Sequence, residues 1–163
     1  MLRDSNIYGD KVMDAEFYMR EAIELAKIAA AQGEVPVGAV VVKGDEIVGR
    51  GYNRREGDKN ALSHAEIIAI DEACKKLGGW RLFQCDLYVT LEPCIMCAGA
   101  IIQSRIKNIF YGAKDFKGGA FGSSINILES KNINHYPNVE GGILEQECGE
   151  IISNYFRNKR KSS

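Results

Sequence analysis

The chain has 163 residues, of which 45% are hydrophobic and 26% charged, values that suit one globular domain and exclude a disordered or fibrous protein. Its formal net charge of −1 excludes a protein that coats nucleic acid through overall charge, so an RNA or DNA partner must contact a local patch. The sequence shows neither a secretory signal nor an apolar run of about 18 residues. We therefore expect a soluble, cytoplasmic protein without a membrane partner, whose five cysteines stay reduced.

The first half of the chain predicts a helix, a hairpin and a second helix. Helical periodicity over residues 14–32 indicates an amphipathic helix, with Asp14 as its N-cap. The apolar segments within residues 35–53 flank Gly44-Asp45, a pattern typical of two strands joined by a tight turn. Apolar side chains at helical spacing over residues 64–77 then predict the second helix.

The second half predicts a parallel pair of strands. Residues 85–91 and 105–113 have strand character, and the apolar segment between them predicts a helix with Pro93 near its first position. A strand, a helix and a strand of these lengths form a βαβ crossover, which makes the two strands parallel. A closing helix is expected over residues 144–160. The elements together predict one mixed sheet with helices on both faces.

His64 and Glu66 stand two positions apart at the predicted start of the second helix. Side chains at i and i+2 point in different directions within a helix, so the pair cannot meet at one reacting atom. One interpretation is a capping box, in which Ser63 and Glu66 satisfy each other's backbone amides. The alternative is that His64 binds a metal ion while Glu66, inside the first turn, exchanges protons with a water that the metal activates.

Cys94 and Cys97 supply two further metal ligands on one helix face. Their position at a helix N-terminus lowers thiol pKa values, although a redox-active C-x-x-C or half of a structural zinc site would have the same spacing. The remaining cysteines and His135 are isolated, so a closed site lacks a fourth ligand. We therefore favour one catalytic zinc ion per chain, held by His64, Cys94 and Cys97, with Glu66 as general base and then general acid.

The segments His64-Ala65-Glu66 and Pro93-Cys94-Ile95-Met96-Cys97 carry the H-x-E and P-C-x-x-C signature of zinc nucleobase deaminases. Over roughly residues 14 to 158 the chain resembles the bacterial tRNA-specific adenosine deaminase family, within the zinc-dependent cytidine and deoxycytidylate deaminase superfamily, through GEVPVGAVVV, LYVTLEPCIMCAGAI and SRIKNIFYGAKDFKGGAFGS. This resemblance implies a three-layer α/β/α cytidine-deaminase-like fold with a mixed, mostly five-stranded sheet. It also implies a homodimer that converts adenosine to inosine at the wobble position of a tRNA anticodon stem-loop.

The resemblance assigns the same zinc ligands and the same proton shuttle, and it adds a set of substrate-binding residues. These are Asn53, Ala65, Pro93, Asp115, Lys117, Phe156 and Arg157. Three of them also have a purely structural interpretation, because Asn53 can cap a strand end, Asp115 can stabilise its own turn and Phe156 can belong to the core.

The resemblance divides the chain into an N-terminal extension over residues 1–13, a zinc deaminase domain over residues 14–158 and a short basic tail over residues 159–163. The chain departs from the family pattern in three places: residues 60–63 read Asn-Ala-Leu-Ser where Asp-Pro-Thr-Ala is usual, Gly118 replaces a common Thr, and Tyr155 replaces a common Phe. Two other functions stay open. One is deamination of free guanine or cytosine by the same fold, and the other is a non-catalytic, zinc-stabilised RNA-binding module.

Overall fold

The computed structural model describes residues 6–162, which form one mixed five-stranded sheet with the strand order β2-β1-β3-β4-β5. Strand β1 pairs antiparallel with β2 and with β3, whereas β3 pairs parallel with β4, and β4 with β5. In chain order the elements are α1 (Asn6–Ala31), β1 (Gly38–Lys43), β2 (Glu46–Tyr52), α2 (Arg55–Asp58), α3 (Ala65–Leu77), β3 (Cys85–Leu91), α4 (Ile95–Gln103), β4 (Asn108–Ala113), the 3₁₀ helix η1 (Ile127–Glu129), β5 (Asn138–Gly141) and α5 (Glu145–Lys161).

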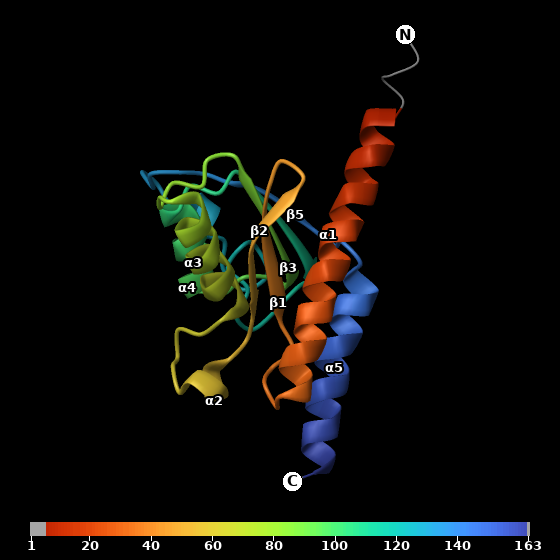
Figure 1. The fold of residues 1–163 in the computed structure, drawn as a ribbon. Coiled ribbons are helices and arrows are strands. Elements are labelled where there is room, and N and C mark those ends of the chain that lie inside the picture. The colour runs from red at the N-terminus through yellow and green to blue at the C-terminus, as the bar shows by residue number, and fades with distance from the viewer. Residues whose placement is uncertain (1–5, 163) are drawn as a thin grey trace.

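Helices cover both faces of the sheet, with α3 and α4 on one side and α1 and α5 on the other (Figure 1). Successive side chains along a strand point to opposite faces of the sheet, so each strand contributes to the hydrophobic core on both faces. Val40, Val42 and Tyr88 are buried in the cluster that includes residues of α1 and α5, whereas Val41 and Leu87 are buried in the cluster that includes residues of α3 and α4. This arrangement confirms the predicted three-layer α/β/α fold. Within residues 6–162, no helix combines the length and the apolarity that crossing a membrane requires.

The structure differs from the sequence-based expectations at α1, at Pro93 and at β5. Helix α1 begins at Asn6, so Asp14 lies inside it rather than capping it, and the helix crosses the expected boundary between extension and domain. A good N-cap residue is still tolerated in a helix interior, and no proline precedes it here to stop the helix. Pro93 lies before the N-cap of α4 instead of within the helix. Strand β5 was not predicted, because its four residues Asn138–Gly141 lack an alternating apolar pattern.

Helix α3 lies directly against β2 because two glycines of that strand leave room for it. A Cβ atom at Gly51 would overlap the carbonyl oxygen of Ala65, and one at Gly49 would overlap that of Ala69. The helix backbone therefore rests on the strand backbone, and the contact at Gly51 involves the first residue of the helix. This close approach determines where the start of α3 lies relative to the sheet.

We expect the Gly51→Ala variant to be about 1 to 3 kcal/mol less stable than the wild type, because the added methyl group must push the start of α3 away from β2. Denaturant unfolding measures this difference. Gly99→Ala is the matched control, since a Cβ atom at Gly99 of α4 would meet no atom within 4 Å. Equal unfolding free energies for the two variants would contradict this account of the packing.

Candidate active site

The N-termini of α3 and α4 meet at one end of the sheet. His64 is the N-cap of α3 and Cys94 the N-cap of α4, and both have extended backbone conformations with φ −80°, ψ 151° and φ −75°, ψ 177°. An N-cap side chain usually accepts a hydrogen bond from the first amides of its helix. In the described part of the chain neither side chain does so, and both are therefore available to bind a ligand.

The three predicted metal ligands lie together in a geometry that fits zinc. The Nδ1 atom of His64 is 3.7 Å from Sγ of Cys94 and 3.5 Å from Sγ of Cys97, and the three atoms lie within 4.8 Å of one another. Tetrahedral coordination with Zn–S bonds of about 2.3 Å and Zn–N bonds of about 2.0 Å separates nitrogen from sulfur by about 3.5 Å. Within residues 6–162 no fourth His, Cys, Asp or Glu joins the group, so a metal bound here keeps a position open.

The two thiols of this group differ in acidity. A hydrogen bond with Cys97 is the main reason that the pKa of Cys94 falls to about 3, and the contact with His64 lowers it further. The same hydrogen bond, together with burial, raises the pKa of Cys97, which is fully buried. The lowered pKa favours the thiolate form of Cys94 beside the imidazole, an arrangement that attracts a cation.

Glu66 is a buried carboxyl group in the first turn of α3, only 4% exposed. Burial raises its pKa, and the charge of the neighbouring His64 acts in the opposite direction. The capping-box interpretation is wrong, because Ser63 precedes the N-cap and its Oγ donates a hydrogen bond to Oδ2 of Asp58 at 2.9 Å. A buried carboxyl group with a raised pKa, next to a candidate metal site, has the properties of a general acid and base.

Asn53 takes over the capping function that the His64 side chain leaves open. Its Oδ1 accepts a hydrogen bond from the amide of Ala65 at 2.9 Å, and its own backbone amide donates to the carbonyl of Val37. The side chain is thus fixed next to the metal ligands, although it caps a helix start rather than a strand end. Its Nδ2 group has no hydrogen-bond partner among residues 6–162 and remains available to a substrate.

The loop after β4 carries two more predicted substrate-binding residues. Oδ1 of Asp115 accepts the backbone amides of Lys117 and Gly118, each at 3.1 Å, so this carboxylate stabilises its own turn. The Lys117 side chain is exposed. The structure therefore leaves a role in substrate binding open for the lysine and gives the aspartate a structural one.

Glu92 holds this loop in place, and the sequence analysis missed it. The residue is 2% exposed, and its carboxylate accepts hydrogen bonds from the amides of Asp115, Phe121 and Ser123 at 3.1 to 3.2 Å and from the Ser123 hydroxyl. Because Glu92 is two residues before Cys94, it connects the loop to the start of α4. The sequence signal that could have revealed Glu92 is a charged residue directly after the apolar strand segment CDLYVTL.

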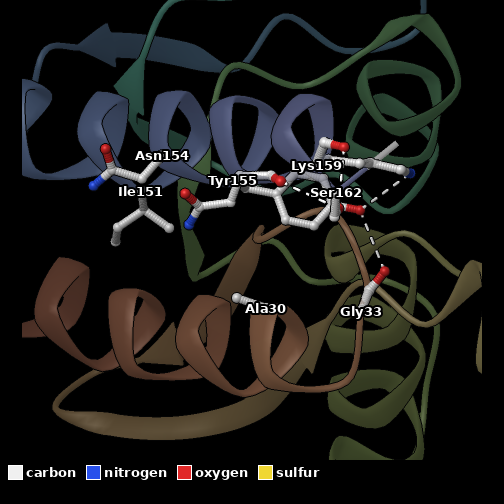
Figure 2. Close-up of a pocket in the computed structure, with 8 residues that line it drawn as sticks. Ala30, Gly33, Ile151, Asn154, Tyr155, Lys159 and Ser162 are labelled. Carbon is white, nitrogen blue, oxygen red and sulfur yellow. Dashed lines mark hydrogen bonds between the residues drawn. The ribbon is translucent and has the colours of Figure 1, made fainter.

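Helix α5 passes the C-terminal end of α1, where Figure 2 shows Tyr155 facing the turn at Gly33. The Tyr155 hydroxyl donates a hydrogen bond to the Gly33 carbonyl at 3.2 Å, which gives a structural reason for the departure from phenylalanine at this position. The next residue, Phe156, is 44% exposed and contacts the Tyr155 ring edge to face, so it is not a core residue. Arg157 is exposed as well.

Comparisons with known proteins identify the family of this chain. The sequence profile of MafB19-like deaminases matches residues 13–160. The chain is 51% identical over 146 residues to the tRNA-specific adenosine deaminase of Bacillus subtilis, covering 90% of this chain and 91% of that protein. The chain belongs to the tRNA-specific adenosine deaminase family. A solved structure from a study of A-to-I editing by tRNA:A34 deaminases at the wobble position superposes on this deaminase fold with a TM-score of 0.81 and 43% identity, covering 83% of this chain and 98% of that one.

The fold is also similar to that of a solved guanine deaminase, but this similarity is lower. The structure of a guanine deaminase from Bacillus subtilis has a TM-score of 0.58 and 32% identity, covering 71% of this chain and 85% of that one. Both the sequence and the backbone of this deaminase are thus more similar to the tRNA deaminases, and the free-base alternative is not favoured.

Proposed function

We propose that the protein hydrolyses adenosine to inosine at the wobble position of a tRNA anticodon, with one zinc ion held by His64, Cys94 and Cys97. The main support is the grouping of the two thiols and the imidazole at two helix starts, with the buried Glu66 in the first turn of one of these helices. We further propose that the enzyme acts in the cytoplasm as a homodimer, as the resemblance to its family implies.

The proposed chemistry divides between the metal and Glu66. Zinc bound by two thiolates and an imidazole supplies Lewis-acid activation of water at neutral pH. The carboxylate of Glu66 takes a proton from the water that adds to C6 of adenine and returns it to the base, so that ammonia can leave. Burial raises the pKa of Glu66, which favours its protonated form and so supports the return of the proton to the base. Asn53 would orient the nucleotide through its Nδ2 group.

A tRNA substrate, rather than a free base, is supported by the position of the α5 C-terminus. Strand β3 runs antiparallel to β1, so the Cys94 end of β3 lies where β1 begins, next to the end of α1. The hydrogen bond from Tyr155 to Gly33 holds α5 at this same end. The exposed Phe156 and the basic residues after it therefore lie toward the same end of the sheet as the candidate active site, although α5 covers the opposite face, and an anticodon loop bound at that end can contact both.

Incubation with an adenosine-containing anticodon stem-loop, followed by nucleoside analysis for inosine, tests the function directly. We expect inosine from the stem-loop and little product from free guanine or cytosine. Conversion of a free base without conversion of the RNA would favour the free-base alternative. Tight RNA binding without any product would favour a non-catalytic RNA-binding module.

Deleting residues 156–163 should weaken stem-loop binding and leave metal content unchanged. The deletion removes an exposed aromatic ring and four basic side chains, Arg157, Lys159, Arg160 and Lys161. Each RNA phosphate that is no longer neutralised by a basic side chain should flatten the dependence of log K on log salt by about 0.7, the value for single strands. Fluorescence anisotropy at several salt concentrations measures both quantities, and the deletion keeps Tyr155 to hold α5 against Gly33.

The double variant Lys75→Ala/Lys76→Ala is the control for charge. These lysines lie in the last turn of α3, the far end of that helix from His64, and they pair with Asp71 and Glu46. Their removal should leave the salt slope unchanged. A deletion variant with wild-type affinity and slope would mean that the basic end of α5 is only a solvated tail.

A further inference from the structure

Phe116 is an exposed phenylalanine between two exposed lysines, in the segment Lys114–Gly118, which we call the 114–118 loop. At 76% exposure it is the most exposed large hydrophobic side chain among the described residues. Single exposed apolar side chains are common, but this one is flanked by Lys114 and Lys117. Neither lysine side chain has an ion pair or hydrogen bond within residues 6–162. An aromatic ring between two unpaired cations is a typical single-stranded nucleic-acid contact.

The backbone of the 114–118 loop is held on both sides of Phe116. Before the ring, the Asp115 amide donates to the buried Glu92 carboxylate at 3.2 Å. After it, Asp115 accepts the amides of Lys117 and Gly118 through Oδ1, and that of Gly119 through its carbonyl at 2.8 Å. A ring presented from a fixed backbone loses little conformational freedom on binding, which favours its use as a contact surface.

The loop lies beside the candidate metal site. Glu92, which binds the amide of Asp115, is separated from Cys94 only by Pro93. Further along the same segment, the amide of Ala120 donates to the carbonyl of Pro93 at 2.9 Å. Phe116 therefore follows directly after Asp115, whose amide is hydrogen-bonded to Glu92 at the end of β3. This end of β3 leads into the metal ligands.

We propose that Phe116 stacks on the base of a nucleotide next to the target adenosine, while Lys114 and Lys117 contact the adjoining phosphates. This inference rests on the proposed function and adds a substrate-binding residue to it. An anticodon loop that releases one base into the pocket also unstacks its neighbours, and an aromatic platform recovers part of that free energy. The two ammonium groups make RNA a more suitable occupant of this surface than an apolar face of another protein.

The test compares Phe116→Ala and Phe116→Trp in stem-loop binding by fluorescence anisotropy. If Phe116 stacks on one base, Phe116→Ala should bind the stem-loop about 10-fold to 100-fold more weakly than the wild type. Phe116→Trp, which keeps an aromatic ring, should bind with near-wild-type affinity. Two further stem-loops carry an abasic site, one on each side of the target. With one of them the wild type and Phe116→Ala should bind equally, because the stacking partner is missing. Thermal unfolding and metal content should not change, since the side chain is exposed.

Phe83→Ala is the matched control, because Phe83 is 57% exposed and precedes β3, at the opposite end of that strand from Cys94. It should bind RNA like the wild type. Unchanged affinity of Phe116→Ala, an equal loss with both abasic stem-loops, or a change in oligomeric mass by light scattering would each overturn the inference. A wild-type protein that neither binds nor deaminates the stem-loop would instead contradict the proposed function itself.

Discussion

Replacing Glu66 by glutamine should lower turnover about 10²-fold to 10⁴-fold and leave the metal bound. The amide keeps the size of the carboxyl group but cannot take a proton from water or pass one to the base. A group that acts as base and then as acid contributes to both steps, so the loss can exceed this range. Inosine formation under single-turnover conditions measures the rate, and elemental analysis measures the metal.

Glu72→Gln is the control for the substitution itself. Glu72 lies on the same helix, α3, but its side chain is exposed. This variant should retain both rate and metal. If Glu66→Gln were as active as Glu72→Gln, Glu66 would be only a structural residue at the helix start. If Glu66→Gln lost its metal, the carboxyl group would be a ligand rather than a proton shuttle.

Replacing Cys97 by serine should remove the metal and, with it, essentially all activity. The wild type should contain about one zinc ion per chain, because three ligands are present and one position is open. Changes to residues that only support a ligand typically weaken metal affinity about 10-fold to 100-fold, and loss of a ligand should exceed this. Competition with a chromophoric chelator measures the zinc affinity. Adding one equivalent of zinc should not restore the activity of the Cys97→Ser variant.

Cys74→Ser is the matched control for the loss of a thiol. Cys74 is a free, partly exposed cysteine of α3 that does not belong to the group of candidate ligands. It should retain zinc and activity. Wild-type zinc affinity in Cys97→Ser would mean that the ion binds elsewhere. Wild-type protein that contains no zinc after purification and reconstitution would contradict the proposed cofactor.

Most of the fold could be predicted, because it rests on patterns of short range. The hairpin around Gly44-Asp45, the parallel pair β3–β4 and the helices α3, α4 and α5 all follow from apolar periodicity and turn residues. Errors arose where periodicity carried no information. Strand β5 is short and mostly exposed, and the helical periodicity over residues 14–32 does not show where α1 begins.

The candidate site divides in the same way. The sequence by itself determined the types of the reactive groups and their placement at helix starts, since H-x-E and P-C-x-x-C are local patterns at the beginning of amphipathic segments. It also indicated three ligands and an open position, because the remaining cysteines and His135 are isolated in the sequence. These conclusions need only the order of residues along the chain.

Only the tertiary structure decided how these groups meet and which of their neighbours support them. His64 and Cys94 follow β2 and β3, which are separated by β1 in the sheet, so their contact depends on strand order and on the glycines that let α3 rest on β2. The burial of Glu92 and the exposure of Phe116 were decided in the same way. Hydrogen bonds and burial between distant segments depend on the three-dimensional path of the chain, and the periodicity of each segment does not specify that path.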